Sequence, residues 1–210
     1  MATLTGATAG ATCRPPRRGL GAGGLPCWGN IGSMESLKGR LLISGAGLFD
    51  PNFRHTVVLV AEHGDGGAFG VVLNRPLGVT VAEAASELAG MVAPGEQLFT
   101  GGPVEPAGAL VVAEFEHPEL VTQPVVGSIG LVAVGETPAG LVRARVFAGH
   151  SGWGAAQLEG ELDAEAWIVE DARPEDVFCT EPNQLWSSVL RRKGDAYTML
   201  STMPFDPTMN

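Results

Sequence analysis

A continuous run of β-branched and aliphatic residues, Val57 to Ala61, constrains the fold of this chain more than any other feature. Within Arg54–Glu62, this run predicts a β-strand that is buried on both faces. The Gly/Asp-rich segment Gly64–Gly67 then interrupts the pattern, and a second strand is predicted over Ala68–Asn74. Two such strands around a short glycine-rich loop indicate an antiparallel hairpin, which we expect to end at Pro76.

Further short apolar segments separated by turn residues predict more strands. They are Arg40–Ser44, Leu98–Thr100, Ala109–Phe115, Ile129–Val134, Leu141–Phe147 and Trp167–Val169. Three segments have the signals of helices. One starts at the capping-box pair Thr80 and Glu83 and stops at Gly90 or Pro94, and the others span Gly154–Leu162 and Thr180–Lys193. Helices are too few for a doubly wound sheet, so we expect an α+β fold with a mostly antiparallel, barrel-like β-sheet flanked by about three helices.

The first 33 residues differ from the rest, because they are rich in Gly, Ala, Thr and Pro and contain no acidic residue. Such a segment buries too little apolar surface to offset the entropy lost on ordering. We therefore expect a disordered tail over 1–33 and a single domain over 34–210. A start codon misassigned upstream of Met34 explains the tail better than a cleaved targeting peptide does, since the tail lacks an amphipathic pattern.

Composition excludes several classes of protein. The formal net charge of −10 argues against binding to nucleic acid through bulk charge. No apolar run reaches the roughly 18 residues that a membrane helix needs. The three cysteines, Cys13, Cys27 and Cys179, form no C-x-x-C pair, which fits neither a disulfide framework nor a zinc site. We therefore expect a soluble, cytoplasmic protein without a metal or cofactor.

The segment Gly149–Trp153 is the strongest candidate for chemistry, because it is predicted to form a turn between a strand and a helix. A nucleophile elbow, G-x-S-x-G, occupies that position in serine hydrolases and would expose Ser151. Here, however, Trp153 replaces the last glycine, and all four histidines lie at or before position 150. A hydrolase that uses Ser151 or His150 is therefore the alternative function, and a glycine-rich turn with Trp153 at the core is favoured.

Two other polar clusters have simpler interpretations. Glu62, His63 and Asp65 offer potential metal ligands, but a polar hairpin tip explains them better. Gln157, Glu159 and Glu161 follow Trp153 on a predicted helix, and we expect them to face solvent.

Asn74 and Arg75 form a more specific candidate site. Arg75 ends an apolar strand and is one of few basic residues in an acidic chain, so it can receive a carboxylate or phosphate. A surface ion pair is the competing explanation. The pair Gly101–Gly102 offers backbone N–H groups that can hold an anion, although it lacks the Lys-Ser/Thr of a phosphate loop.

Several motifs in order along the chain resemble the YqgE/AlgH family. They are Phe53–Leu59, Glu62–His63, Gly67–Gly70, Val72–Pro76, Thr100–Val104, Gly149–Gly154, Gln157–Leu162 and Trp167. The resemblance covers about residues 37–195. His150 stands where the family usually has an aromatic residue such as Tyr, and Ala156 where Gly is usual. The family also accepts Ala at the position of Ser151, which weakens the hydrolase hypothesis.

The resemblance implies a single α+β domain with a barrel-like sheet, and no established catalytic residues or cofactor. Family members are named as transcriptional regulators, but the acidic composition and the lack of a helix-turn-helix pattern argue against direct DNA binding. We expect a non-enzymatic binding protein with an indirect regulatory role, acting through a protein partner or a small ligand. The expected binding residues lie at strand ends or turns and would line one cleft. They are Asn74, Arg75, Gly101, Gly102, His150 and Trp153.

Overall fold

The structure, a computed structural model, describes residues 36–135 and 137–203, all of which belong to one compact unit, Glu35–Asn210. The expected disordered tail at 1–33 lies outside the described residues, and the single domain over 34–210 stays a prediction. The strands of the described part are β1 (Arg40–Ser44), β2 (Val57–Gly64), β3 (Gly67–Val72), β4 (Pro76–Thr80), β5 (Gln97–Thr100), β6 (Val104–Phe115), β7 (Gln123–Val126), β8 (Ile129–Val132), β9 (Leu141–Trp153) and β10 (Trp167–Asp171). Its helices are α1 (Val81–Ala84), α2 (Gln157–Asp163), α3 (Pro174–Val177) and α4 (Pro182–Lys193), with 3₁₀ turns η1 (Ser86–Met91), η2 (Pro118–Leu120), η3 (Asp195–Tyr197) and η4 (Leu200–Thr202).

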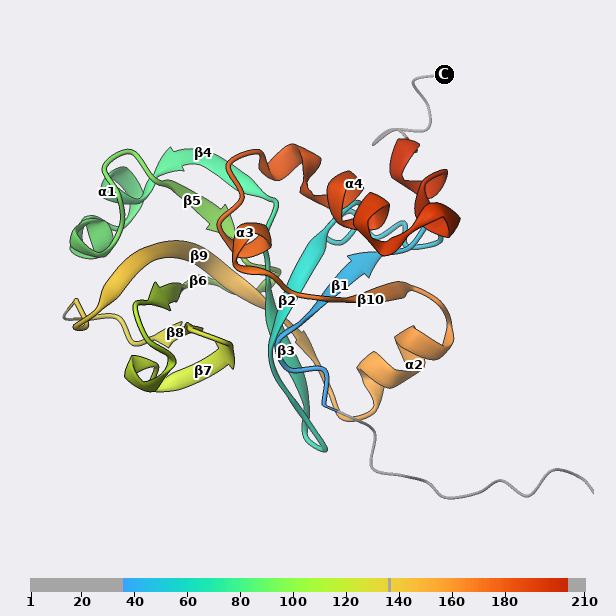
Figure 1. Ribbon diagram of the computed structural model, residues 1–210, viewed down its shortest axis with the longest axis horizontal. Helices are drawn as coiled ribbons and strands as arrows, with labels where there is room; N and C mark the ends of the chain where they lie inside the picture. The colour runs from blue at the N-terminus through green and yellow to red at the C-terminus, as the bar shows by residue number, and fades with distance from the viewer. Residues whose placement is uncertain (1–35, 136, 204–210) are drawn as a thin grey trace, which may run out of the picture. The chain divides into compact units, whose positions relative to one another are not determined.

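The strands form one sheet in the order β10-β1-β2-β3-β9-β6-β8-β7, with β5 branching from β9 and β4 pairing with β5 (Figure 1). Each pair is antiparallel except β5 with β9. This confirms a mostly antiparallel α+β fold. The path of strands is open, with β10 at one end and β7 at the other, so the expected barrel-like closure is not confirmed.

Strand β2 lies in the interior of the sheet and is covered on both faces, as its apolar run predicts. Val57, Leu59 and Ala61 pack into the core that α4 covers, whereas Val58 and Val60 pack on the opposite face against residues of α2. The hairpin of β2 and β3 is also confirmed, with Gly64 paired to Gly67 at its tip.

Strand β9 is longer than the sequence predicts and corrects our interpretation of Gly149–Trp153. These residues are part of the strand, not a turn after it. Gly149, at φ 68°, allows the strand to bend there. Beyond the bend, Ser151 pairs with Gly70 of β3, whereas the first part of the strand pairs with β6. One strand therefore connects the two parts of the sheet.

The helices also differ from prediction at their ends. Thr80 and Glu83 form the expected capping box, but α1 stops at Ala84 and the chain continues as the 3₁₀ turn η1. Ala85, at φ −147° and ψ 71°, interrupts the helix and lets Leu88 and Met91 reach the same core as Val81. Helix α4 begins at Pro182, with Glu181 rather than Thr180 at its N-cap.

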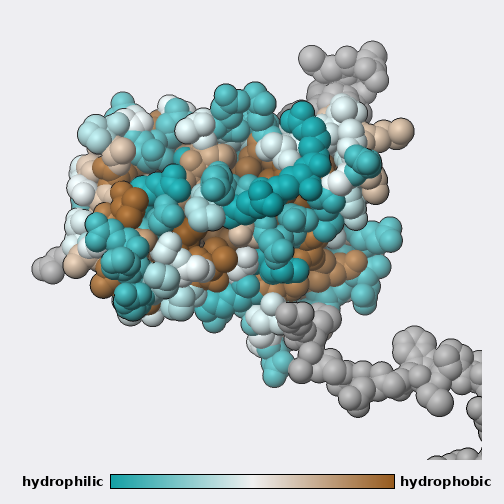
Figure 2. All heavy atoms as spheres, in the orientation of Figure 1, coloured by the Kyte–Doolittle hydropathy of each residue, from teal (hydrophilic) through white to brown (hydrophobic). Residues whose placement is uncertain are grey.

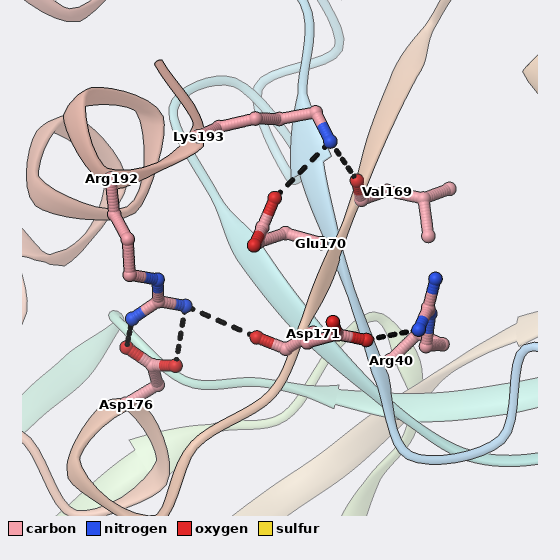
Figure 3. A network of polar contacts seen from close by, with 7 residues as sticks. All are labelled: Arg40, Val169, Glu170, Asp171, Asp176, Arg192 and Lys193. Carbon is pink, nitrogen blue, oxygen red and sulfur yellow. Dashed lines mark hydrogen bonds and ion pairs between the residues drawn. The ribbon is translucent and has the colours of Figure 1, made fainter.

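The C-terminal end of α4 is held to β10 and α3 by the polar network in Figure 3. Arg192 donates to both carboxylate oxygens of Asp176, at 2.7 and 2.8 Å, and to the backbone oxygen of Asp171. Lys193 donates to the backbone of Val169 at 2.7 Å and to Glu170 at 3.1 Å. These partners fix the basic residues more firmly than a helix dipole alone would.

Hydrophilic side chains cover much of the face seen in Figure 2, with smaller hydrophobic patches between them. Helix α4, the longest of the described helices, has 12 residues. Within residues 36–135 and 137–203, no helix is both long enough and apolar enough to span a bilayer.

Candidate functional site

Asn74 fixes two backbone segments beside a cavity that is lined mostly by polar side chains. It follows β3, is buried, and accepts a hydrogen bond from the backbone N–H of Val57 at 3.0 Å. Its amide nitrogen donates to the backbone oxygen of His55 at 2.8 Å. Because both ends of the amide are engaged, Asn74 is a positioning residue that fixes the chain on either side of Thr56.

His55 is held in an unusual conformation at this point. Its φ of 51° lies in the left-handed region, which non-glycine residues rarely adopt. The imidazole ring stacks on Trp186 of α4, with centroids 3.9 Å apart and planes 10° from parallel. The Trp186 indole in turn donates to the backbone oxygen of Ser44 at 3.0 Å. The ring stack thus joins the segment before β2 to α4, and the hydrogen bond joins the end of β1 to the same helix.

Arg75 lies at the junction between these elements and lines a cavity of about 430 Å³, which we name the Arg75 cavity. The guanidinium donates to the backbone oxygen of Arg54. Besides Arg75, the lining consists of neutral polar and apolar side chains and one imidazole. These residues are His55, Asn74, Asn183, Trp186, Ser187, Ser201 and Met203.

The electrostatics of the Arg75 cavity differ from those of the chain as a whole. None of its described lining residues is acidic, although the protein carries a net charge of −10. Burial lowers the pKa of Arg75, and its guanidinium still remains protonated near neutral pH. Burial, followed by the charges of Arg54 and Arg75, lowers the pKa of His55, so this ring is neutral near pH 7.

Gly101 and Gly102 mark a close crossing of two backbones. The N–H of Gly101 donates to Ala148 at 2.8 Å, and its oxygen accepts from Val72 at 2.9 Å. A Cβ atom on Gly102 would lie 2.4 Å from the backbone oxygen of His150. The glycines are therefore required for packing against β9. Gly102 and Arg75 also line a smaller cavity of about 220 Å³.

The remaining two candidates point elsewhere. His150 lines a third cavity, with its ring edge-on to Phe69. Trp153 is buried, and its indole donates to Glu161 at 2.9 Å. The three candidate stretches thus come together in space through backbone contacts, but their side chains do not line one common cleft.

On helix α2, Gln157 is exposed as expected, but Glu159 and Glu161 are half-buried and engaged in protein contacts, which corrects our expectation for these two acids. Glu161 accepts hydrogen bonds from the indoles of Trp153 and Trp167, the latter at 2.7 Å. Glu159 contacts the ring of His63 at 3.0 Å. A buried indole N–H needs an acceptor, so the two tryptophans flanking this acidic helix were a signal for this arrangement.

Ser151 does not have the surroundings of a nucleophile. Its side chain is fully buried, and its hydroxyl donates to the backbone oxygen of Gly101 at 3.1 Å. Among the described residues, no carboxylate or imidazole is hydrogen-bonded to it. The strand position of Ser151 also removes the strained turn that an elbow needs.

The polar residues near the hairpin tip are engaged in protein contacts. Nδ1 of His63 accepts from the backbone N–H of Leu37 at 3.1 Å, and Glu62 pairs with Lys38. Across the described part of the chain, no group of three or more His, Cys, Asp or Glu residues is placed to hold a metal ion.

These features define an α+β domain on an open, mostly antiparallel sheet, with a basic cavity where β3 ends against α4. A family model described as AlgH-like matches residues 41–198, and the chain belongs to this family. The sequence resemblance is thereby confirmed.

Bacterial relatives match most of the chain. A protein named UPF0301 from Streptomyces avermitilis is 41% identical over 187 residues, covering 84% of this chain and 97% of its own length. A UPF0301 protein from Mycobacterium tuberculosis is 38% identical over 181 residues, covering 82% of this chain and 90% of the relative.

Two solved structures share the fold. Protein DIP2367 from Corynebacterium diphtheriae superimposes with a TM-score of 0.72 and 25% identity, covering 82% of this chain and 95% of that one. The solution structure of the AlgH protein from Pseudomonas aeruginosa gives a TM-score of 0.60 and 28% identity, with coverages of 83% and 98%.

Sequence reasoning missed the residues that complete the Arg75 cavity from α4, Asn183, Trp186 and Ser187. They lie more than a hundred positions from Arg75, and their spacing shows only a helix with one apolar face. His55 had no signal beyond its place in a family motif.

Proposed function

We propose that this protein binds a small anionic ligand, a carboxylate or a phosphate ester, in the Arg75 cavity. The observation that carries this proposal is the charge of the lining: a half-buried arginine and no described carboxylate, in a protein of net charge −10. A volume of about 430 Å³ suits a metabolite-sized molecule.

Two further features favour a negative charge here. Asn183 lies in the first turn of α4, so one wall of the cavity is near the positive end of the helix dipole. Arg75 is half-buried, so less water screens its guanidinium than at a fully exposed arginine. An anion in contact with it would therefore gain more than one at an exposed arginine.

The chemistry of the lining supports binding rather than turnover, since it offers hydrogen-bond donors and a fixed charge. We therefore extend the proposal to a non-enzymatic, cytoplasmic binding protein, in which the bound ligand alters the surface offered to a protein partner. Such a coupling would give it an indirect regulatory role without direct contact with nucleic acid.

Titration of the full chain with three matched probes tests the proposal: phenylacetate, phenyl phosphate and the neutral 2-phenylethanol. The expected result is ¹H–¹⁵N shift changes at Asn183, the Trp186 indole and Ser187 with both anions, and much weaker binding of the alcohol. Arg75→Gln should weaken phenylacetate binding by about 10- to 150-fold, because a hydrogen bond to a charged group is worth about 1.5–3 kcal/mol. Arg75→Lys should restore part of the affinity.

Arg40→Gln is the matched control, since Arg40 is an exposed partner of Asp171 and its loss removes the same charge. It should leave anion binding unchanged. The proposal is wrong if Arg75→Gln remains folded by circular dichroism and binds both anions as the parent protein does. It is equally wrong if 2-phenylethanol binds as tightly as phenylacetate.

A further inference from the structure

The cavity that His150 lines has a volume of about 280 Å³ and lies between β3, β6 and β9, and unlike the Arg75 cavity it contains an acidic side chain and no basic one apart from the imidazole. Its apolar walls come from Phe69, Ala109 and Leu110, and its polar groups are Glu105 and His150. We name it the Glu105 cavity. Of its lining residues, only His150 was among the binding residues expected from the sequence, and none of them lines the Arg75 cavity.

The Glu105 cavity is built by an irregularity in the pairing of β6 with β9. Val104 pairs with His150 and Ala109 pairs with Ala148, so residues 105–108 lie opposite Gly149 alone. Glu105 has φ 48° and Gly149 has φ 68°, both in the left-handed region. A Cβ atom at Gly149 would lie 2.8 Å from the Val104 oxygen, so glycine is needed there. Bulges of this kind redirect side chains at sheet edges and binding sites.

The His150 ring is positioned by its neighbours. It stands edge-on to Phe69, with centroids 5.9 Å apart and an interplanar angle of 80°. Its Nε2 and Cδ2 atoms lie 3.9 Å from the Cβ position of Gly152, so the ring passes over bare backbone. Within the described part of the chain, neither the His150 ring nor the Glu105 carboxylate makes a hydrogen bond or an ion pair. Both groups can therefore serve a ligand.

We propose that the Glu105 cavity binds a small organic cation, a primary amine carried on an apolar body. The Glu105 carboxylate would pair with the ammonium group, which would also donate a hydrogen bond to an imidazole nitrogen of His150. Phe69 and Leu110 would cover the apolar part. The net charge of −10 favours the approach of cations and disfavours anions.

The test is a ¹H–¹⁵N titration of the full chain with phenethylamine, 2-phenylethanol and phenylacetate, which differ mainly in the polar group. Phenethylamine should shift Phe69, Leu110 and His150, and affinity for this cavity should fall from amine to alcohol to acid. Glu105→Gln should weaken amine binding by about threefold, which is the scale of an exposed ion pair. His150→Phe keeps an aromatic ring, removes the acceptor and should weaken the amine as well.

Glu119→Gln is the matched control, because Glu119 is an exposed acid on η2 whose loss changes the net charge equally. It should leave amine binding unaltered. Equal binding of the amine and the alcohol at these residues, or amine shifts that Glu105→Gln and His150→Phe both leave intact, would overturn the proposal. Arg75→Gln should not affect amine binding, so this site and the Arg75 cavity succeed or fail separately.

Discussion

At the scale of single residues, glycine has two opposite roles in this chain. Gly101 lies where two backbones cross, and a Cβ atom there would be 2.2 Å from the Gly149 oxygen. We expect Gly101→Ala to lower the free energy of unfolding by about 2–3 kcal/mol, the typical effect of overpacking. Urea denaturation measures the change.

Gly160 provides the contrasting case, since it lies within α2 and nothing lies within 4 Å of its Cβ position. Gly160→Ala should raise the free energy of unfolding by about 0.5–1 kcal/mol through helix propensity. Equal effects of the two substitutions would contradict the packing role of Gly101. The sequence predicts a turn at Gly101–Gly102, but the close approach depends on Gly149 and His150, almost fifty positions later.

At the scale of elements, the ion pair of Arg192 with Asp176 anchors α4. The Asp176 side chain is 6% exposed and also accepts from the backbone of Arg173, so removing it leaves a partly buried guanidinium without its carboxylate. Asp176→Ala should lower the free energy of unfolding by about 3 kcal/mol. Thermal or urea unfolding checks this value.

Asp171→Ala is the control, because Asp171 pairs with Arg40 at a site where its side chain is 72% exposed. Such pairs contribute less than about 1 kcal/mol. If both variants unfold alike, Asp176 is not the anchor. The sequence shows basic residues at the end of a predicted helix, where they suit the helix dipole, but it does not reveal their acidic partners, which lie on other elements.

Element ends were less predictable than element cores. The apolar patterns of β2 and β3 predict both strands, because the buried positions of each strand appear directly as apolar residues in the sequence. The extent of β9 could not be predicted, because a glycine at 149 fits a turn and a bent strand equally well until Gly70 is known to pair with Ser151.

At the scale of the whole molecule, His55 makes stability depend on pH. Burial, then Arg54 and Arg75, lower the pKa of His55 below its ordinary 6.5. Above pH 6.5 the His55 ring is mostly neutral in both the folded and the unfolded protein. As pH falls below 6.5, the unfolded chain binds a proton that the folded protein resists, so the free energy of unfolding decreases until the folded pKa is passed.

His55→Gln should therefore flatten the decline in the free energy of unfolding between about pH 7 and pH 5, where histidine titrates. Urea titrations at several pH values measure the slope. His117→Gln, at an exposed position, should keep the slope of the parent protein. An unchanged slope in His55→Gln would show that the Arg75 cavity does not resist protonation.

The pairing of β9 has a consequence for how the chain is made. Its three neighbours, β3, β5 and β6, are all synthesised before β9. The partner of β1, β10, is synthesised later still. A nascent chain that stops short of Leu141 therefore has three separate groups of paired strands with open edges, β1-β2-β3, β4-β5 and β6-β8-β7. We therefore expect the sheet to be completed only after this late strand emerges, and we expect the open edges to be prone to pairing with other chains until then.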